Sequence, residues 1–146
     1  MACVFCTDAA TAGDLVYEDE HAFVLLHPDW SPRGHAMVVA KAHVENVSGL
    51  EEEAWLHLAR VWHRAETVLL EATGAERAMV LKLGIQTPHL HVHIYPVSAA
   101  ASRDEVFAAF DGKSGEPCDE AFVREVRARM GRRMVRTTDN RPLTTS

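Results

Sequence analysis

Three histidines at alternate positions are the residues of this chain best suited to chemistry. His89, His91 and His93 are separated by single apolar residues, and the run 89–95 reads HLHVHIY. Successive side chains of a β-strand point to opposite faces, so this spacing places the three imidazole rings on one face and the apolar side chains on the other. We therefore expect a strand whose polar face meets an anion or a metal ion.

Three roles are open for this row of imidazoles. The first is structural, and it requires a hydrogen-bond partner for every neutral ring. The second is metal binding. The third is nucleophilic or phosphate chemistry, which suits imidazole because its usual pKa of about 6.5 leaves the ring neutral at physiological pH. We favour the third interpretation.

The cysteines offer a second candidate site near the N-terminus. Cys3 and Cys6 form a C-x-x-C pair, and Cys118 is the third cysteine of the chain. An odd number does not indicate a disulfide framework. The pair has three interpretations: a redox pair, half of a zinc site, or a chance spacing. The excess of histidines favours half of a zinc site, because Cys and His are the usual zinc ligands.

The apolar pattern predicts an α+β fold, in which an antiparallel β-sheet of about five strands carries one long helix. Short apolar runs predict strands at residues 15–17, 22–26, 36–40 and 78–83, and the histidine strand follows a turn at 84–88. The first two strands are close enough in sequence to form a hairpin.

The helices follow from apolar residues at three- and four-residue steps. Such a stripe runs through residues 54–69, and Ser48 and Glu51 have the spacing of a capping box at its start. Ser102 and Glu105 form a second box ahead of a short helix, and a last amphipathic helix is predicted at 119–130. We expect three parts: a main domain at 1–98, a C-terminal helical extension of it at 99–133, and a mobile tail at 134–146.

Composition and charge exclude several classes of protein. The chain has 146 residues, of which 47% are hydrophobic and 25% charged, as in one ordinary globular domain. A net charge of -6 argues against a surface that binds nucleic acid. Neither a membrane span nor a secretory signal is recognisable. We expect a cytoplasmic protein with no nucleic-acid or membrane partner.

Residues 89–95 resemble the signature of the histidine triad (HIT) family, in which three histidines alternate with apolar residues. Two further landmarks agree in type and order. Gly34-His35 stands before an apolar strand that leads to Lys41-x-His43, and the C-x-x-C pair stands before residues 16–20, which read VYEDE. The resemblance covers residues 3–96, and it implies a HIT-like fold for residues 1–98 and a homodimer.

The resemblance also implies nucleotide chemistry. It predicts hydrolysis or transfer at the α-phosphate of a nucleoside phosphoramidate or a dinucleoside polyphosphate, through a covalent nucleotidyl-histidine intermediate. His91 is the implied nucleophile, His93 the contact to the phosphate or the leaving group, and His35 the completion of the polar cluster from a neighbouring strand. We expect these rings to form a cationic cradle for the phosphate, with no catalytic cofactor.

Some members of the family, bacterial ones among them, bind zinc through an N-terminal C-x-x-C, the histidine of Lys-x-His and the first triad histidine. Carried onto this chain, the ligands are Cys3, Cys6, His43 and His89, a closed Cys₂His₂ set of the structural kind. The resemblance therefore implies a structural zinc ion that fixes the N-terminal segment without touching the substrate.

Candidate substrate-binding residues follow from the same resemblance. A glutamine and a hydroxyl residue before the triad hold phosphate in the family, and here they are Gln86 and Thr87, with one residue fewer than usual before the triad. The family places an Asp or Asn eight residues before the histidine of Gly-His. This chain has His27 there, and Asp29 follows two residues later. Phe5 completes the set, and the expected ligand is a purine nucleotide or nucleotide conjugate.

Two other classes of function stay open at this point. One is a metal-dependent hydrolase in which the histidine cluster of His35, His89, His91 and His93 binds a catalytic ion, although alternating strand positions hold successive rings far apart for one ion. The other is a nucleotide-binding or interaction protein with little turnover, which the histidine at the ribose position suggests.

Overall fold

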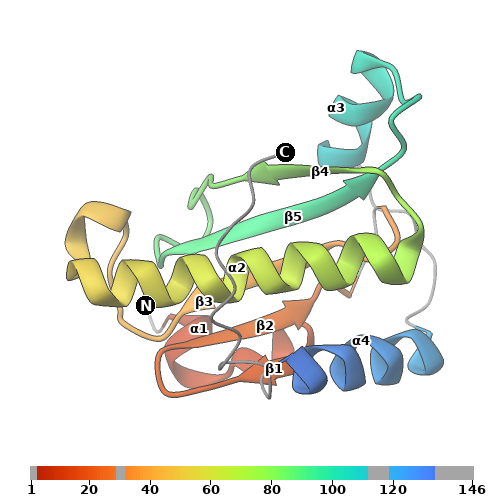
Figure 1. The fold of residues 1–146 in the computed structure, drawn as a ribbon. Helices are drawn as coiled ribbons and strands as arrows, with labels where there is room; N and C mark the ends of the chain where they lie inside the picture. The colour runs from red at the N-terminus through yellow and green to blue at the C-terminus, as the bar shows by residue number, and fades with distance from the viewer. Residues whose placement is uncertain (1–2, 29–31, 112–118, 134–146) are drawn as a thin grey trace, which may run out of the picture.

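A single antiparallel sheet is the centre of the fold. The computed structural model describes residues 3–28, 32–111 and 119–133. The described strands follow one another across the sheet in the order β1-β2-β3-β5-β4 (Figure 1). Their bounds are Asp14–Glu18 for β1, Ala22–Leu26 for β2, Ala36–Ala40 for β3, Arg77–Leu81 for β4 and His91–Val97 for β5.

The helices lie on both sides and at the ends of this sheet. Within the described residues they are α1 (Val4–Thr7), α2 (Glu52–Thr73), α3 (Arg103–Asp111) and α4 (Glu120–Arg133), with short 3-10 turns η1 (Ala9–Thr11) and η2 (Val47–Gly49). The long helix α2 crosses one face of the sheet, α4 lies beside β1, and α3 stands beyond the end of β5 (Figure 1). The predicted α+β class, the long helix and the extra C-terminal helical segment are all confirmed.

One face of the sheet forms the main hydrophobic core. Val92 and Ile94 of β5 belong to this core, which they share with α2. The face of α2 that is buried there has the spacing of an amphipathic helix on a sheet, as the sequence predicted. Its fully or nearly buried members are Leu58, Val61, Ala65, Val68 and Leu69.

The alternate residues of β5 face the other way, as the period of two requires. His91 pairs across the sheet with Val39 of β3, and His93 pairs with Met37. Both β3 residues belong to a second, smaller core, to which α1 contributes Phe5. The histidine face is therefore covered by the N-terminal segment, whereas α2 covers the apolar face.

The strand of the histidines begins later than predicted. β5 starts at His91 rather than at His89. The reason is a turn before the strand, in which the backbone N–H of His89 donates to the carbonyl of Thr87 at 2.8 Å. Leu90, the next residue, already donates its N–H to the carbonyl of Val44 at 2.7 Å. His89 thus leads into the sheet without being part of a strand.

The two predicted capping boxes have opposite outcomes. The first is wrong: α2 begins at Glu52 without a side-chain cap, because Ser48 lies within η2 and Leu50 is extended between the two helices. The second is confirmed, since the backbone N–H of Glu105 donates to Ser102 Oγ at 3.2 Å.

The last described helix fastens one edge of the sheet. The apolar stripe of α4, which includes Phe122, Val126 and Met130, is buried in the main core. On the same helix, the Arg127 guanidinium donates to the carbonyl of Leu15 in β1 at 2.8 and 3.1 Å. The predicted tail at 134–146 lies outside the described residues. Across the described part of the chain, no helix combines the length and the apolar character that a bilayer span needs.

Candidate functional site

A cleft of about 550 Å³ opens on the histidine face of the sheet. Its walls come from β5, from α1, from the loop before the triad and from the end of α3. The described residues that line it are Val4, Phe5, Ala12, His27, His35, Met37, Leu83, Gly84, Ile85, Gln86, Thr87, His91, His93, Tyr95, Ala109, Phe110 and Asp111. It therefore contains the three histidines predicted to be catalytic and four of the five predicted substrate-binding residues.

His91 is held in one orientation and one tautomer. Its Nδ1 lies 2.6 Å from the carbonyl oxygen of His89. Because a carbonyl can only accept, Nδ1 carries the proton and Nε2 keeps a free lone pair. The ring is 7% exposed, and burial is the main cause that lowers its pKa. A neutral imidazole with an unprotonated Nε2 is the reactive form of a histidine nucleophile.

His93 and His35 form a second hydrogen-bonded unit beside it. His35 Nε2 lies 2.8 Å from His93 Nδ1, so one of these two nitrogens donates to the other. Burial, together with the neighbouring imidazoles, lowers the pKa of His35 to about 2 and that of His93 to about 4. The predicted cationic cradle is therefore wrong for the resting protein, because these rings are neutral at physiological pH.

A row of stacked rings crosses the sheet at the end of the cleft nearest α3. His35 stacks on His27 with 4.4 Å between ring centroids and on Tyr95 with 4.0 Å. Phe110 of α3 packs against Tyr95 at 4.8 Å. The four rings come from the residue after β2, the residue before β3, β5 and α3. Each ring supports the next, and the row fixes His35 against His93.

Gly34 explains why a glycine stands before His35. Its φ of +87° is in the left-handed region, and an added Cβ would come within 2.8 Å of Thr73 Cγ2 and 3.3 Å of Pro96 Cγ. Only glycine takes this backbone conformation without strain and without a clash. The Gly-His pair is therefore a means of turning the chain into β3 with His35 directed at the cleft.

The predicted substrate-binding residues are mostly brought together. Phe5 and His27 line the cleft, as do Gln86 and Thr87 from the loop before β5. Asp29 lies outside the described residues, so its prediction stays untested.

Sequence reasoning assigned no site residue to α3. Ala109, Phe110 and Asp111, at the end of this helix, line the cleft. Asp111 is close enough to Tyr95 to raise the pKa of its phenol, after burial as the larger cause. The spacing of Phe107 and Phe110 on an amphipathic segment was the available signal, but it does not say which surface the aromatic side chains reach.

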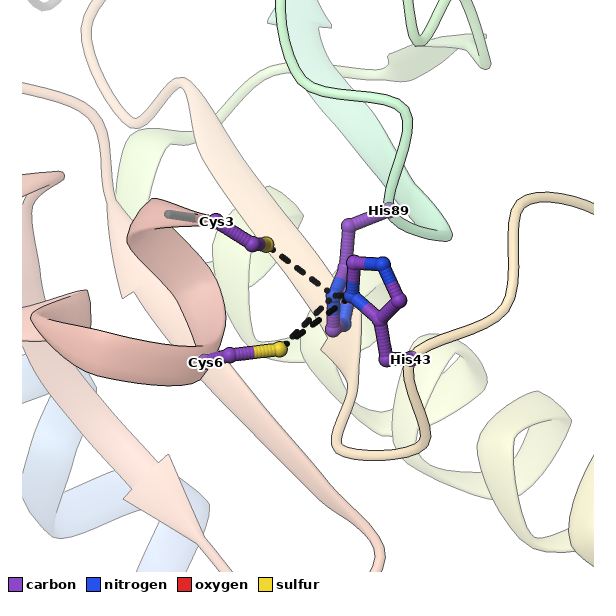
Figure 2. Close-up of side chains that lie close together, drawn as sticks. All are labelled: Cys3, Cys6, His43 and His89. Carbon is purple, nitrogen blue, oxygen red and sulfur yellow. Dashed lines mark hydrogen bonds between the residues drawn. The ribbon is translucent and has the colours of Figure 1, made fainter. Parts of the chain in front are cut away.

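The four predicted metal ligands converge beside the cleft (Figure 2). One ligand atom from each of Cys3, Cys6, His43 and His89 lies within 4.8 Å of all the others. His89 Nδ1 is 3.3 Å from Cys3 Sγ, 3.5 Å from Cys6 Sγ and 3.1 Å from His43 Nδ1. No other group of three or more His, Cys, Asp or Glu side chains with this convergence occurs among the described residues.

The protonation of His89 suits a metal ligand. Its Nε2 lies 2.5 Å from the carbonyl oxygen of Ala40, so Nε2 carries the proton and Nδ1 turns its lone pair toward the two sulfur atoms. His89 is 1% exposed. Two thiols and two imidazoles make a complete tetrahedral set for zinc, and none of the four residues lines the cleft.

Residues 9–99 match the family model of the HIT domain. This chain belongs to the HIT family. "Protein hit" of Bacillus subtilis (strain 168) is 32% identical over an alignment of 107 residues, and the match covers 64% of this chain and 70% of that protein. The range matched by the family model, residues 9–99, leaves out Cys3, Cys6 and the two C-terminal helices α3 and α4.

Solved structures share the fold. A hypothetical histidine triad nucleotide-binding protein from Sulfolobus tokodaii superimposes with a TM-score of 0.71 at 25% identity. The match covers 97% of this chain and 100% of that one. A zinc-bound histidine triad family protein from Mycobacterium smegmatis has a TM-score of 0.69 at 22% identity, covering 92% of this chain and 97% of that one. The predicted HIT-like fold is confirmed.

Proposed function

We propose that this protein is a nucleotidyl hydrolase or transferase that acts at the α-phosphate of a nucleotide, with His91 as the nucleophile. The observation that carries the proposal is the hydrogen bond from His91 Nδ1 to the His89 carbonyl, since it leaves the Nε2 lone pair available on the wall of a nucleotide-sized cleft. Membership of the HIT family supports nucleotide chemistry in general.

The reaction proceeds in two displacements at phosphorus. In the first, the lone pair of His91 Nε2 forms a bond to the α-phosphorus, and the bond from phosphorus to the leaving group breaks. The leaving group keeps that electron pair and takes up a proton. The His91 ring is now cationic, and its Nδ1–H still donates to the His89 carbonyl, which stabilises the charge. A water oxygen then bonds to phosphorus, the bond from phosphorus to His91 Nε2 breaks, and the proton of the water passes to the solvent. This step releases a nucleoside monophosphate and restores neutral His91.

His93 and His35 act together in this scheme. With His35 Nε2–H donating to His93 Nδ1, His93 carries its own proton on Nε2. That N–H donates to a phosphoryl oxygen. Because the His93 ring is neutral, the proton that the leaving group takes up comes from water at the open side of the cleft. His35 is then a positioning residue, held by its stacking on His27 and Tyr95.

The substrate is a purine nucleotide joined to a leaving group through a phosphoramidate or a polyphosphate linkage. Its phosphate lies over His91 and His93, with Gln86 and Thr87 as further donors at the edge of the cleft. Phe5, Met37 and other apolar side chains of the lining provide the surface for a base.

Cys3, Cys6, His43 and His89 would hold a structural zinc ion. The convergence of their ligand atoms supports this assignment, as does the zinc-bound relative from Mycobacterium smegmatis. Zinc in such a closed site supplies cross-linking and no open position for substrate. No step of the reaction requires it.

Intact-mass measurement tests the nucleophile. The purified protein is mixed with adenosine phosphoramidate or with diadenosine polyphosphates, quenched in denaturant within the first turnovers, and weighed. We expect an added mass of one adenylyl group on the unaltered protein and none on His91→Ala. His63→Ala is the matched control, because His63 is exposed on α2, and it should form the adduct normally. Undiminished turnover by His91→Ala refutes the assignment.

A second candidate function is nucleotide binding with little turnover. One observation favours it: His27 stacks flat on His35, at 8° between ring planes, where the family resemblance leads to an acidic or amide side chain for the ribose. Calorimetry with AMP, run beside the turnover assay, separates the two functions. Tight AMP binding without adduct or turnover would establish the second.

A further inference from the structure

Phe5 lies between the candidate metal site and the candidate nucleophile. It occupies one of the two positions between Cys3 and Cys6, and its ring is 8% exposed. The ring centroid is 4.9 Å from that of His91 and 5.6 Å from that of His89. The same side chain also lines the cleft. One residue therefore contacts a metal ligand, the nucleophile and the space for the nucleotide.

The helix that carries Phe5 is too short to form by itself. α1 has four residues, whereas isolated helices of fewer than about 12 residues are marginal in water. Its own backbone bonds are few, and they include Thr7 N–H to the Cys3 carbonyl at 3.0 Å and Asp8 N–H to the Val4 carbonyl at 2.8 Å. Its position must therefore come from tertiary contacts.

Two kinds of contact can supply that position. One is the apolar packing of Phe5 in the smaller core, where the Phe23 ring centroid is 6.2 Å away. The other is the meeting of Cys3 and Cys6 with two histidines from distant parts of the chain (Figure 2). A metal ion shared by these four residues would turn the second kind into bonds, and it would fix both ends of the short helix.

His89 makes a second link between the two sites. Its ring nitrogen Nδ1 faces the sulfur atoms, while its backbone carbonyl accepts a hydrogen bond from His91 Nδ1–H, with 2.6 Å between the nitrogen and the oxygen. Any constraint on the His89 ring is passed to the carbonyl that selects the tautomer of His91. The metal cluster and the nucleophile are thus joined through Phe5 on one side and through His89 on the other.

We propose that zinc at Cys3, Cys6, His43 and His89 and a nucleotide in the cleft bind cooperatively, and that Phe5 is the positioning residue that couples them. Zinc fixes α1, α1 holds Phe5 against His91, and the nucleotide binds to the wall so formed. The nucleotide part of this statement rests on the function proposed above. Coupling between two ligands is reciprocal, so the nucleotide must raise the zinc affinity by the factor by which zinc raises the nucleotide affinity.

Zinc affinity is the readout that does not depend on activity. The full chain is titrated with zinc in competition with a chromophoric chelator, with and without saturating AMP. We expect AMP to tighten zinc binding by about tenfold, which is within the usual range for coupled sites. An equal zinc affinity in both titrations overturns the cooperativity and leaves the proposed catalytic function standing.

Phe5→Ala tests the coupling residue. All four metal ligands remain, so zinc still binds, but we expect the effect of AMP on zinc affinity to fall from about tenfold to less than about twofold. Phe5→Leu keeps most of the apolar volume and should restore part of the coupling. Phe107→Ala is the matched truncation at a phenylalanine that is 52% exposed on α3, and it should keep the full coupling. Full coupling in Phe5→Ala refutes the role of this residue.

A nucleotide-free measurement separates this inference from the proposed function. The imidazole nitrogens of His91 are followed by NMR in the zinc-loaded and the zinc-free protein. In the zinc-loaded protein, we expect one tautomer of His91, with the proton on Nδ1. In the zinc-free protein and in Phe5→Ala, we expect a mixture of the two neutral tautomers. If AMP does not bind at all, the proposed function fails, and the NMR result still decides the link to His91. The same single tautomer with and without zinc overturns that link.

Discussion

The two faces of β5 differ in what they contribute, although the same seven residues build both. Val92 and Ile94 are buried under α2 in the main core of apolar side chains, where packing and removal from water stabilise the fold. His91 is buried and His93, two positions later, is half-buried, and their polar neighbours fix the position of their protons. The comparison teaches that burial serves stability on one face and preorganised chemistry on the other.

The largest expected effect is the loss of activity in His91→Ala. Removal of the nucleophile should lower kcat by about three orders of magnitude or more, because no other described group has a free ring nitrogen in the same place. The urea midpoint should change far less than for a truncation under α2. Steady-state assays and urea titrations on the same preparation check both halves. If His91→Ala kept its activity but unfolded at a much lower urea concentration, His91 would serve stability and not catalysis.

Ile94→Ala should produce the opposite result. Ile94 is 0% exposed, so its truncation leaves a cavity in the main core and should cost about 2–5 kcal/mol of unfolding free energy. The kcat of the molecules that remain folded should change little. Ile85→Ala is the matched control, because Ile85 is 82% exposed and its truncation should cost less than about 0.5 kcal/mol. Equal losses of stability in the two variants would contradict the assignment of the core.

Acidification should weaken the fold through the histidine face. The pKa of His35 is lowered to about 2 and that of His93 to about 4, so below pH 6.5 the unfolded chain binds protons that the folded chain does not. Their contribution is fully present above pH 6.5 and is lost as the pH falls, by about 2 kcal/mol in total between pH 6.5 and 5.5.

Urea titrations at a series of pH values measure this loss. They are best made on Cys3→Ser/Cys6→Ser protein, since acid also releases zinc from a Cys-His site. Constant stability from pH 7 to pH 5.5 would show that the two rings are not held neutral.

The smallest of these kinetic effects is expected at α3. Phe110→Ala removes the end ring of the row that supports His35 through Tyr95, and it should raise KM by about fivefold, or about 1 kcal/mol. Phe107→Ala, one turn earlier and more exposed, should change KM by less than about twofold. Equal effects of the two substitutions would mean that α3 acts by its presence alone and not through Tyr95.

Much of this architecture was predictable because local patterns determine it. The period of two in β5 and the stripe of α2 each specify which side chains are buried, and both predictions are confirmed. The resemblance to the HIT family predicted the four metal ligands, and the structure brings Cys3 and Cys6 close to His43 and His89.

Three features could not be predicted from local patterns. The neutral state of His35 and His93 depends on their burial among other rings, which only the tertiary structure determines. The wall formed by Phe110 and Asp111 depends on where α3 folds back, and no periodicity specifies that. The predicted capping box at Ser48 had the right spacing, but Ser48 lies inside the 3-10 turn η2 and is therefore not at the start of α2. The domain boundaries, the homodimer and the cytoplasmic location stay predictions.

The neutral rings have a consequence for the way in which phosphate is attracted. Among the described lining residues, Asp111 is the one side chain of Asp, Glu, Lys or Arg type. Oriented N–H dipoles at short range, rather than net positive charge, must then hold the anion. Dissolved ions screen interactions between exposed charges over about 10 Å at 0.1 M, and they affect buried contacts much less. Nucleotide affinity should therefore be nearly indifferent to ionic strength, unlike that of a site lined with lysine and arginine.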